Sequence, residues 1–187
     1  ECTWMKGPNT INNTGSYGTK GVSNPSNLPR SRSETSCSWT DNAGNFWLYG
    51  GINTSGALFS DLWRYDIAAN EWTWMQGAIY QPAVYGTQGV ADPANTPGGR
   101  YVYASWTDLT DNLWLFGGNP ASSSSTAKND LWKYDIAANQ WTWMKGPNTI
   151  NDTGNYGAKC VTANSNVPPA RLENRARVRD ACGNFWC

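Results

Sequence analysis

The stretch "DLWKYDIAANQWTWMKG", from Asp130 to Gly146, decides the fold of this chain. The stretch from Asp61 to Gly77 reads "DLWRYDIAANEWTWMQG", and 14 of its 17 residues are identical. The string "TWMKGPNTIN" begins at Thr3 and begins again at Thr142. The three Trp-Met pairs therefore recur at intervals of 70 and 69 residues, which predicts a repeat architecture.

A second landmark has the same period. "DNAGNFWLYGG" begins at Asp41, returns as "DLTDNLWLFGG" at Asp108, and returns shortened as "DACGNFWC" at Asp180. Within one repeat, "YVYASWTD", "NLWLFGG", "DLWKYD" and "WTWM" are short aromatic-rich runs bounded by Gly, Asn, Asp or Pro, which is typical of β-strands. The segment "YDIAAN" is too short for a helix between two strands, so we expect a hairpin loop there. Each repeat of about 70 residues thus predicts four antiparallel strands.

These landmarks, in this order, resemble the kelch repeat of galactose-oxidase-type β-propellers. The hallmarks of that repeat are an Arg before the first strand, Gly-Gly after the second, Tyr-Asp in the third and Trp in the fourth. They fall on Arg100, Gly117, Gly118, Tyr134 and Trp141 in the middle repeat, and on Arg30 or Arg32, Gly50, Gly51, Tyr65 and Trp72 in the first. The resemblance implies an all-β fold, a kelch-type β-propeller segment built from four-stranded antiparallel blades.

Two residue types have structural roles in such blades. Glycine pairs tolerate positive φ and close backbone approach where a strand ends near a crowded axis. Strand tryptophans are expected to form the core between blades rather than a sugar-binding surface. The tryptophans concerned are Trp47, Trp63, Trp72, Trp114, Trp132 and Trp141.

One partial propeller domain is expected over residues 1–187. In chain order it comprises the last strand of a preceding blade with a long loop (1–29), a blade (30–75), a long loop (76–99), a blade (100–144), a long loop (145–170) and a truncated blade (171–187). The long loops resemble those of secreted bacterial kelch-like proteins. Because the sequence opens within a repeat, either a leader has been removed or the chain is a piece of a longer one. Half-blades would expose an open strand edge and an aromatic face.

The truncated blade departs from the repeat pattern. Strand alternation would place Arg175, Arg177 and Arg179 on one face, where the other repeats have neutral residues. Two explanations stay open: a charged edge that discourages further strand pairing, and a fault in the sequence.

Composition argues against several classes of function. The 14 Lys and Arg balance the 14 Asp and Glu, which gives no electrostatic basis for nucleic-acid binding. No apolar run is long enough for membrane insertion. The chain has no His, which excludes within it the copper chemistry that the galactose-oxidase resemblance implies, and Ser-His-Asp catalysis as well. The recurring Asp residues are interpreted as turn and strand-end caps, so no catalytic, cofactor or metal site is predicted.

The long loops are the candidate ligand-binding surface, because binding is usually built on loops held by a rigid scaffold. The candidate binding residues are Tyr17, Tyr80, Tyr85 and Tyr156. Three N-x-[ST] sequons predict glycosylation sites at Asn12, Asn53 and Asn151. In an oxidising compartment disulfides are expected among Cys2, Cys37, Cys160, Cys182 and Cys187, and the sequence does not determine their pairing.

These features favour a non-catalytic, secreted or cell-surface propeller module for protein binding or structural self-assembly. Its expected partners are further blades of the same or another chain, through self-association of open blade edges. One alternative is a lectin-like propeller that binds glycans. The other is a fragment of a larger carbohydrate-active enzyme whose catalytic residues lie outside this chain.

Overall fold

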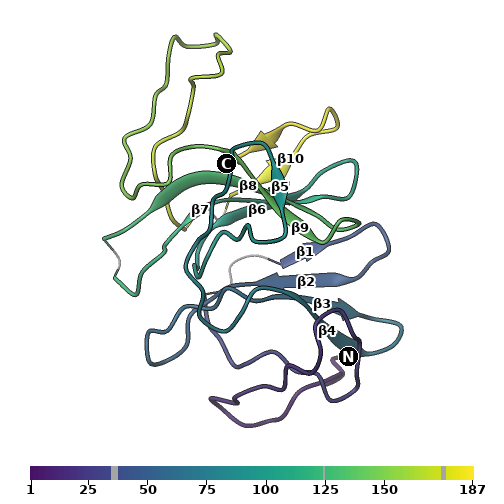
Figure 1. Cartoon of the computed structure of the whole chain (residues 1–187). Coiled ribbons are helices and arrows are strands. Elements are labelled where there is room, and N and C mark those ends of the chain that lie inside the picture. The colour runs from purple at the N-terminus through teal and green to yellow at the C-terminus, as the bar shows by residue number, and fades with distance from the viewer. Residues whose placement is uncertain (35–37, 124, 174–175) are drawn as a thin grey trace.

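The computed structural model describes residues 1–34, 38–123, 125–173 and 176–187 (Figure 1). Eleven β-strands are assigned in these residues and no α-helix, which confirms the predicted all-β class. The first repeat holds β1 (Ser38–Thr40), β2 (Phe46–Tyr49), β3 (Leu62–Asp66) and β4 (Glu71–Gln76). The second holds β6 (Ala104–Thr107), β7 (Leu113–Gly118), β8 (Lys128–Asp135) and β9 (Gln140–Lys145), with β5 (Ala91–Asp92) before them. The third holds β10 (Val178–Arg179) and β11 (Phe185–Trp186).

Each of the first two repeats folds into its own antiparallel sheet. The first sheet has the order β1-β2-β3-β4, and the second has the order β6-β7-β8-β9 with β5 added beside β9. The predicted four strands per repeat are therefore confirmed. The predicted hairpin loop is confirmed as well, since residues 67–70 and 136–139 are turns between long strands. Asn70 and Asn139 end these turns with φ of 55° and 54°, a left-handed conformation that Asn tolerates better than most residues.

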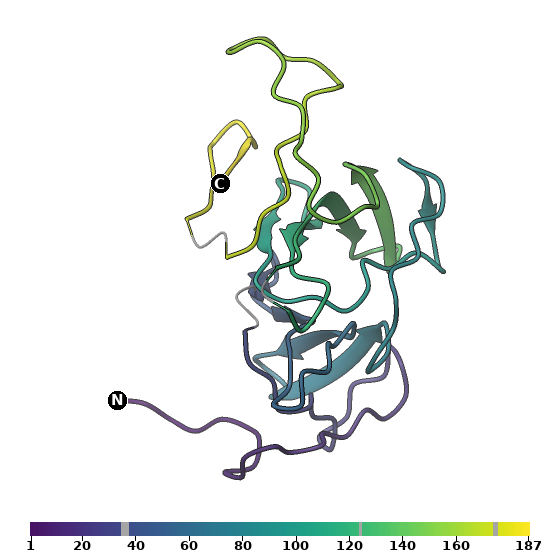
Figure 2. The same ribbon diagram turned by 90° about the vertical axis from the view of Figure 1, so that its left-hand side faces the viewer.

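The two sheets lie one against the other (Figures 1 and 2). Buried aromatic side chains of both sheets form a common core. Strand alternation turns Trp132 and Tyr134 of β8 towards the first sheet. The ring of Tyr134 lies 5.7 Å from that of Trp47, and the ring of Trp141 lies 5.3 Å from that of Tyr49. Of the six tryptophans predicted to be core, Trp47, Trp63, Trp132 and Trp141 are buried, and Trp72 and Trp114 are half-buried.

The glycine pairs after β2 and within β7 have the predicted conformation. The φ of Gly50 is 65° and that of Gly117 is 66°. A Cβ on Gly50 would lie 2.4 Å from the main-chain oxygen of Arg100. Glycine is required at this position both by its backbone conformation and by the close approach of the next repeat.

The long loops differ in what they lie against. The loop before the second sheet adds β5 to the edge of β9, and the loop before the first sheet forms a single bridge from Asn24 to Trp72 of β4. The third loop, coloured yellow-green, projects away from both sheets in both views (Figures 1 and 2). Each of the first two loops therefore covers the last strand of its own sheet. The third contacts the start of β8 instead, where the Asn129 amide donates to Asp152 and to the main-chain oxygen of Pro168, both at 3.0 Å.

The ends of the described structure match the repeat pattern only in part. A strand is expected at the start of residues 1–29, but residues 1–5 form none, and Trp4 is 65% exposed. The predicted hairpin of the truncated blade is present, since β10 pairs with β11 and the ring of Phe185 stacks 5.1 Å from that of Trp106. Arg179 donates a hydrogen bond to the main-chain oxygen of Thr107 at 2.7 Å, and Arg175 lies outside the described residues.

Candidate functional site

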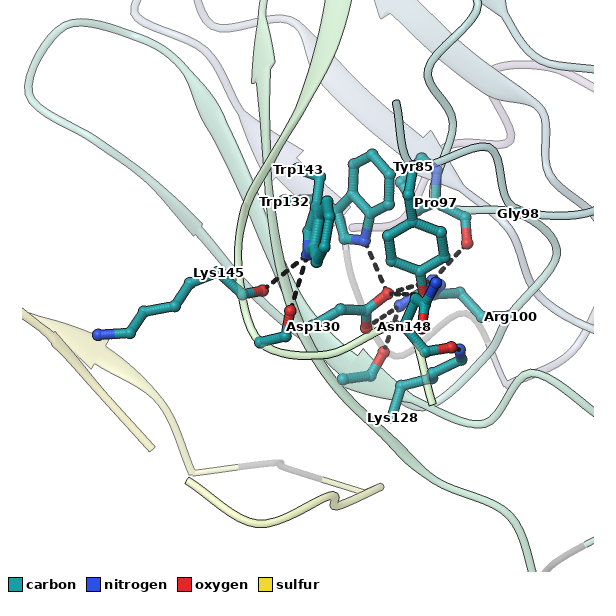
Figure 3. Close-up of polar contacts among 12 residues, drawn as sticks. Tyr85, Pro97, Gly98, Arg100, Lys128, Asp130, Trp132, Trp143, Lys145 and Asn148 are labelled. Carbon is teal, nitrogen blue, oxygen red and sulfur yellow. Dashed lines mark hydrogen bonds and ion pairs between the residues drawn. The ribbon is translucent and has the colours of Figure 1, made fainter. Parts of the chain in front are cut away.

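A group of hydrogen-bonded side chains lies inside the second repeat and is named the Asp130 cluster: Arg100, Asp130, Tyr85 and Trp132 (Figure 3). Both terminal nitrogens of Arg100 donate hydrogen bonds to the Asp130 carboxylate, at 2.7 and 2.9 Å, and both side chains are fully buried. The Tyr85 hydroxyl donates to the same carboxylate at 2.7 Å, and the Trp132 indole donates at 2.8 Å. Four donors from three separate segments thus converge on one carboxylate.

Local structure explains how these side chains meet. Asp130 and Trp132 are two residues apart on β8 and therefore project from the same face of the sheet. Arg100 follows the long loop, and it also donates to the main-chain oxygens of Gly117, at 3.0 Å, and Pro97. The arginine consequently ties the loop, β7 and β8 together.

The first repeat contains a second copy, the Asp61 cluster: Arg32, Asp61, Tyr17 and Trp63. Arg32 forms hydrogen bonds of 2.6 and 2.7 Å with the Asp61 carboxylate. Tyr17 donates to that carboxylate at 2.5 Å and Trp63 donates at 2.7 Å. Arg32, and not Arg30, is therefore the residue equivalent to Arg100.

Burial and charge shift the ionisation of the Asp130 cluster. Burial alone would raise the pKa of Asp130, but the adjacent Arg100 charge lowers it below the ordinary value. Burial alone would lower the pKa of Arg100, but the charge of Asp130, its hydrogen bonds and the nearby Tyr85 and Tyr49 together raise it above the ordinary value. Burial and the nearby carboxylate together raise the pKa of Tyr85. Each group is thereby held in its ordinary charge state, which suits a structural ion pair better than proton transfer.

The four candidate binding tyrosines are not brought together. Tyr17 and Tyr85 lie half-buried, each with its hydroxyl engaged by a buried aspartate. Tyr80 stacks on Phe59 with ring centres 5.8 Å apart, and Tyr156 is 70% exposed on the third loop. The Arg–Asp–Tyr clusters were missed by sequence reasoning, although Tyr, Arg and Asp recur at equivalent places in both complete repeats.

A cavity of about 820 Å³ opens beside the second-repeat loop. Tyr80 is the one candidate tyrosine in its lining, together with Pro97, Ser122 and Lys128. The Lys128 ammonium donates to the main-chain oxygen of Asn148 at 2.6 Å. This cavity combines an exposed aromatic ring with polar side chains, as small-molecule sites do.

The aspartates at the hairpin turns act as the predicted caps. Asp108 accepts from the main-chain nitrogens of Thr110 and Asn112, both at 2.9 Å, and from the Trp114 indole at 2.7 Å. Burial opposes ionisation, but these hydrogen bonds lower the pKa of Asp108 to about 2. Asp41 and Asp180 repeat the arrangement with Trp47 and Trp186. The indole bond, which the sequence did not predict, joins each turn to the strand that follows it.

The remaining predicted residues lie apart from these clusters. Cys2, Cys160, Cys182 and Cys187 are exposed free thiols, and Cys37 lies outside the described residues. Disulfide pairing therefore stays a prediction. The sequon residues Asn12 and Asn151 are exposed and Asn53 is partly so. The Asn151 amide donates to the main-chain oxygen of Ser125 at 2.9 Å and the Asn53 amide donates to the Tyr80 hydroxyl at 3.4 Å, whereas the Asn12 side chain accepts from the Thr54 hydroxyl at 3.4 Å.

Within the described ranges, no helix has the length and hydropathy needed to cross a bilayer. In the same residues, no group of three or more acidic or cysteine side chains is placed to hold a metal ion.

Comparison with known proteins adds little to these observations. No protein-family model matches the chain. A solved structure entitled "Structure of YjhT" is similar over 65% of this chain and 40% of its own, with 15% sequence identity and a TM-score of 0.46. The chain thus spans well under half of that structure, and a likeness of this extent decides neither fold family nor function.

Proposed function

We propose that this chain is a segment of a kelch-type β-propeller that serves as a non-catalytic, extracellular or cell-surface module for protein binding or self-assembly. Three features support this proposal. Two successive repeats form two successive antiparallel sheets, each with four strands of its own repeat and the second with β5 added. The sheets stack through aromatic side chains, and a buried Arg–Asp pair joins the loop to the sheet in each repeat.

One observation carries the binding role. Trp186 on β11 is 59% exposed, whereas the equivalent Trp47 in the first repeat is fully buried against the second sheet. Exposed aromatic surface beside an open strand edge is a hallmark of an interaction surface. The third repeat therefore offers an apolar surface on which a further blade, of the same or another chain, would pack.

Light scattering over a range of chain concentrations tests this role. We expect concentration-dependent association that Trp186→Ser weakens, because the variant removes exposed aromatic area from the open edge. Ile11→Ser is the matched control, since Ile11 is 89% exposed but lies on the first-repeat loop. A chain that stays monomeric at every concentration, and retains no protein from an extracellular extract, would contradict the proposal.

Carbohydrate binding is a second candidate, favoured by the cavity beside Tyr80. An exposed ring stacks on the face of a sugar, and polar groups such as Ser122 bind its hydroxyls. A glycan array tests this function, with Tyr80→Ala expected to abolish binding and Tyr156→Ala expected to preserve it. Hydrolysis of an array glycan would instead favour the carbohydrate-active enzyme.

A further inference from the structure

The second repeat has a lysine at a position where the first repeat has a phenylalanine. Asp61 in the first repeat is equivalent to Asp130 in the second. The residues two places before these aspartates are Phe59 and Lys128. Both are buried, since Phe59 is 0% and Lys128 is 7% exposed. A buried position that changes from apolar to charged points to a specific role, because lysine is almost never buried unless it is paired.

The first repeat shows a favourable arrangement at this position. The Arg32 guanidinium lies over the Phe59 ring, 4.4 Å from its centre, in an attractive cation–π contact. The second repeat has a second cation in place of that ring. Burial lowers the pKa of Lys128, and the charge of Arg100 lowers it further, although Asp130 opposes both effects. The exchange of phenylalanine for lysine therefore replaces an attraction with a repulsion.

The Lys128 ammonium has two contacts, neither of them with a charged group. It donates to the main-chain oxygen of Asn148 at 2.6 Å (Figure 3), and it lies 5.3 Å from the centre of the Tyr85 ring. Among the described residues, no carboxylate lies within ion-pair distance of it, and Asp130 is already paired with Arg100. These two cations and one carboxylate leave one buried positive charge without a partner, and such charges are normally paired in folded proteins.

This charge lies at the wall of the cavity of about 820 Å³. Lys128 and Arg100 are the two charged residues of its lining, which contains no Asp or Glu. Small-molecule sites have volumes of about 300–1,000 Å³, so the cavity has room for a ligand of ordinary size. A cleft with charge of one sign concentrates ligands of the opposite sign. The cavity therefore favours an anion.

The cavity is formed where the two complete repeats meet. Gly56 lies between β2 and β3, and Ser122 lies between β7 and β8. Both line the cavity, and a Cβ on Gly56 would lie 3.3 Å from the Cβ of Ser122. The loop before the second sheet supplies residues 80–83 and 97–100 of the lining. The cavity is thus a product of the contact between these two repeats.

Tyr80 gives the cavity an aromatic wall. Its ring stacks on that of Phe59 with centres 5.8 Å apart, and its hydroxyl accepts from the Asn53 amide at 3.4 Å. The residue is nevertheless 52% exposed. The ring is therefore held in place while part of it stays open to contact. Pro82 and Pro97 add apolar surface to the same lining.

We propose that this cavity binds a small molecule that carries a carboxylate beside a ring, with Lys128 as the partner of the carboxylate and Tyr80 as the contact of the ring. Hydrogen bonds between charged groups are roughly twice as strong as neutral ones. Two kinds of molecule share this chemistry, sugar acids and aromatic acids. The inference deepens the second candidate function, because it states the charge of the ligand, and it rests on the cavity being a binding site.

Two pairs of ligands that differ mainly in the carboxylate test the inference. Glucuronate is compared with glucose, and benzoate is compared with benzamide. Each is titrated into the whole chain at neutral pH by isothermal titration calorimetry. We expect the carboxylate of at least one pair to bind at least about tenfold more tightly than its neutral counterpart, because a hydrogen bond to a charged group has roughly that effect on affinity.

Variants of the chain assign the preference to one residue. Lys128→Met removes the charge, and Phe59 in the first repeat shows that this position accepts an apolar side chain. It is expected to weaken binding of the carboxylate at least about tenfold and to leave binding of the neutral counterpart little changed. Lys128→Arg keeps the charge and should keep the preference.

Lys133→Met is the matched control, since Lys133 lies on the same strand β8 but outside the cavity lining. It is expected to leave binding of all four ligands unchanged. Circular dichroism establishes that each variant retains its β-structure.

Three results would overturn the inference: no saturable binding of either carboxylate, equal affinity within both ligand pairs, or an unchanged preference in Lys128→Met. Equal binding of glucose and glucuronate, without a preference in the benzoate pair, would leave carbohydrate binding standing and reject the inference alone. A preference for benzoate over benzamide that Lys128→Met removes, without binding of either sugar, would support the inference and reject carbohydrate binding.

Discussion

The Tyr85 hydroxyl donates a 2.7 Å hydrogen bond to the buried Asp130 carboxylate, although 45 residues separate them in the chain. Tyr17 and Asp61 form the same contact in the first repeat at 2.5 Å. Tyr156 has the equivalent position in the third repeat and is 70% exposed. One chain thus contains the same tyrosine with and without its carboxylate, which provides an internal control for the energy of the contact.

Removing the Tyr85 hydroxyl should destabilise the fold. A hydrogen bond to a charged group contributes about 1.5–3 kcal/mol, so Tyr85→Phe is expected to lower the free energy of unfolding by about that amount. Tyr156→Phe is expected to change it by less than about 0.5 kcal/mol, as for other exposed substitutions. Urea denaturation measures both, and equal effects would show that the Asp130 contact is not stabilising.

Breaking the Arg100–Asp130 pair should have a larger effect. Arg100→Met leaves a carboxylate uncompensated in the interior, which typically costs about 3–5 kcal/mol. The double variant Arg100→Met, Asp130→Leu removes that charge and is expected to recover part of the loss. Recovery should be incomplete, because Tyr85 and Trp132 lose their acceptor. Thermal unfolding followed by circular dichroism compares the three proteins, and a double variant less stable than the single one would contradict this account.

A methyl group at Gly50 should be tolerated poorly. A non-glycine residue in the left-handed region costs roughly 1–2 kcal/mol, and here the new Cβ also meets the Arg100 oxygen at 2.4 Å. Gly21→Ala is the matched control, since its φ is 74° but no atom lies within 4 Å of the new Cβ. We expect Gly50→Ala to lower the urea midpoint clearly more than Gly21→Ala. Similar midpoints would mean that the sheets separate easily at this contact.

The free energy of unfolding should decrease in acid, because the aspartates at the hairpin turns become protonated. The pKa of Asp108 is about 2 in the folded chain against an ordinary value of 3.8. Because the folded-state pKa is the lower one, its stabilisation is fully present above the ordinary value and is lost as pH falls from about 4 towards 2. Urea midpoints measured from pH 7 to pH 2 should therefore decrease mainly in this window.

Asp108→Asn should weaken this acid dependence and lower stability at neutral pH. Asp92→Asn is the control, because Asp92 lies on an exposed segment and, among the described residues, its side chain accepts a single hydrogen bond, from the nitrogen of Ala94 at 2.8 Å. An Asp108→Asn variant with an unchanged pH profile would assign the acid sensitivity to other carboxylates.

The sequence predicted the sheets well because their signals are local. The repeat period, the aromatic alternation within "DLWKYD" and the glycine pair at Gly117 and Gly118 each specify nearby backbone structure. The all-β class and four strands per repeat are confirmed on this basis. The kelch family and the propeller architecture stay proposals.

The candidate site was harder to predict because its residues lie far apart in the sequence. Tyr85 was proposed as a ligand contact since it lies on a polar loop, and nothing local shows that its hydroxyl reaches β8. Asp130 was interpreted as a strand-end cap, whereas its principal partner is Arg100, 30 residues away. The recurrence of Tyr, Arg and Asp in each complete repeat was the available signal that they act together.

Arg100 also connects the two repeats in a way that bears on how the chain unfolds. Its side chain belongs to the second sheet, but its main-chain oxygen accepts from Gly51 at 2.9 Å and its nitrogen donates to Phe59 at 3.3 Å, both in the first repeat. Arg171 repeats the pattern one repeat later, with main-chain hydrogen bonds to Gly118 and Lys128. Arg100 therefore bonds one repeat through its main chain and the next repeat through its side chain. Separation of the two sheets would displace this arginine and so break the ion pair that stabilises the second repeat. Such coupling between nearest neighbours makes melting cooperative, so both sheets should be lost in one transition rather than one after the other.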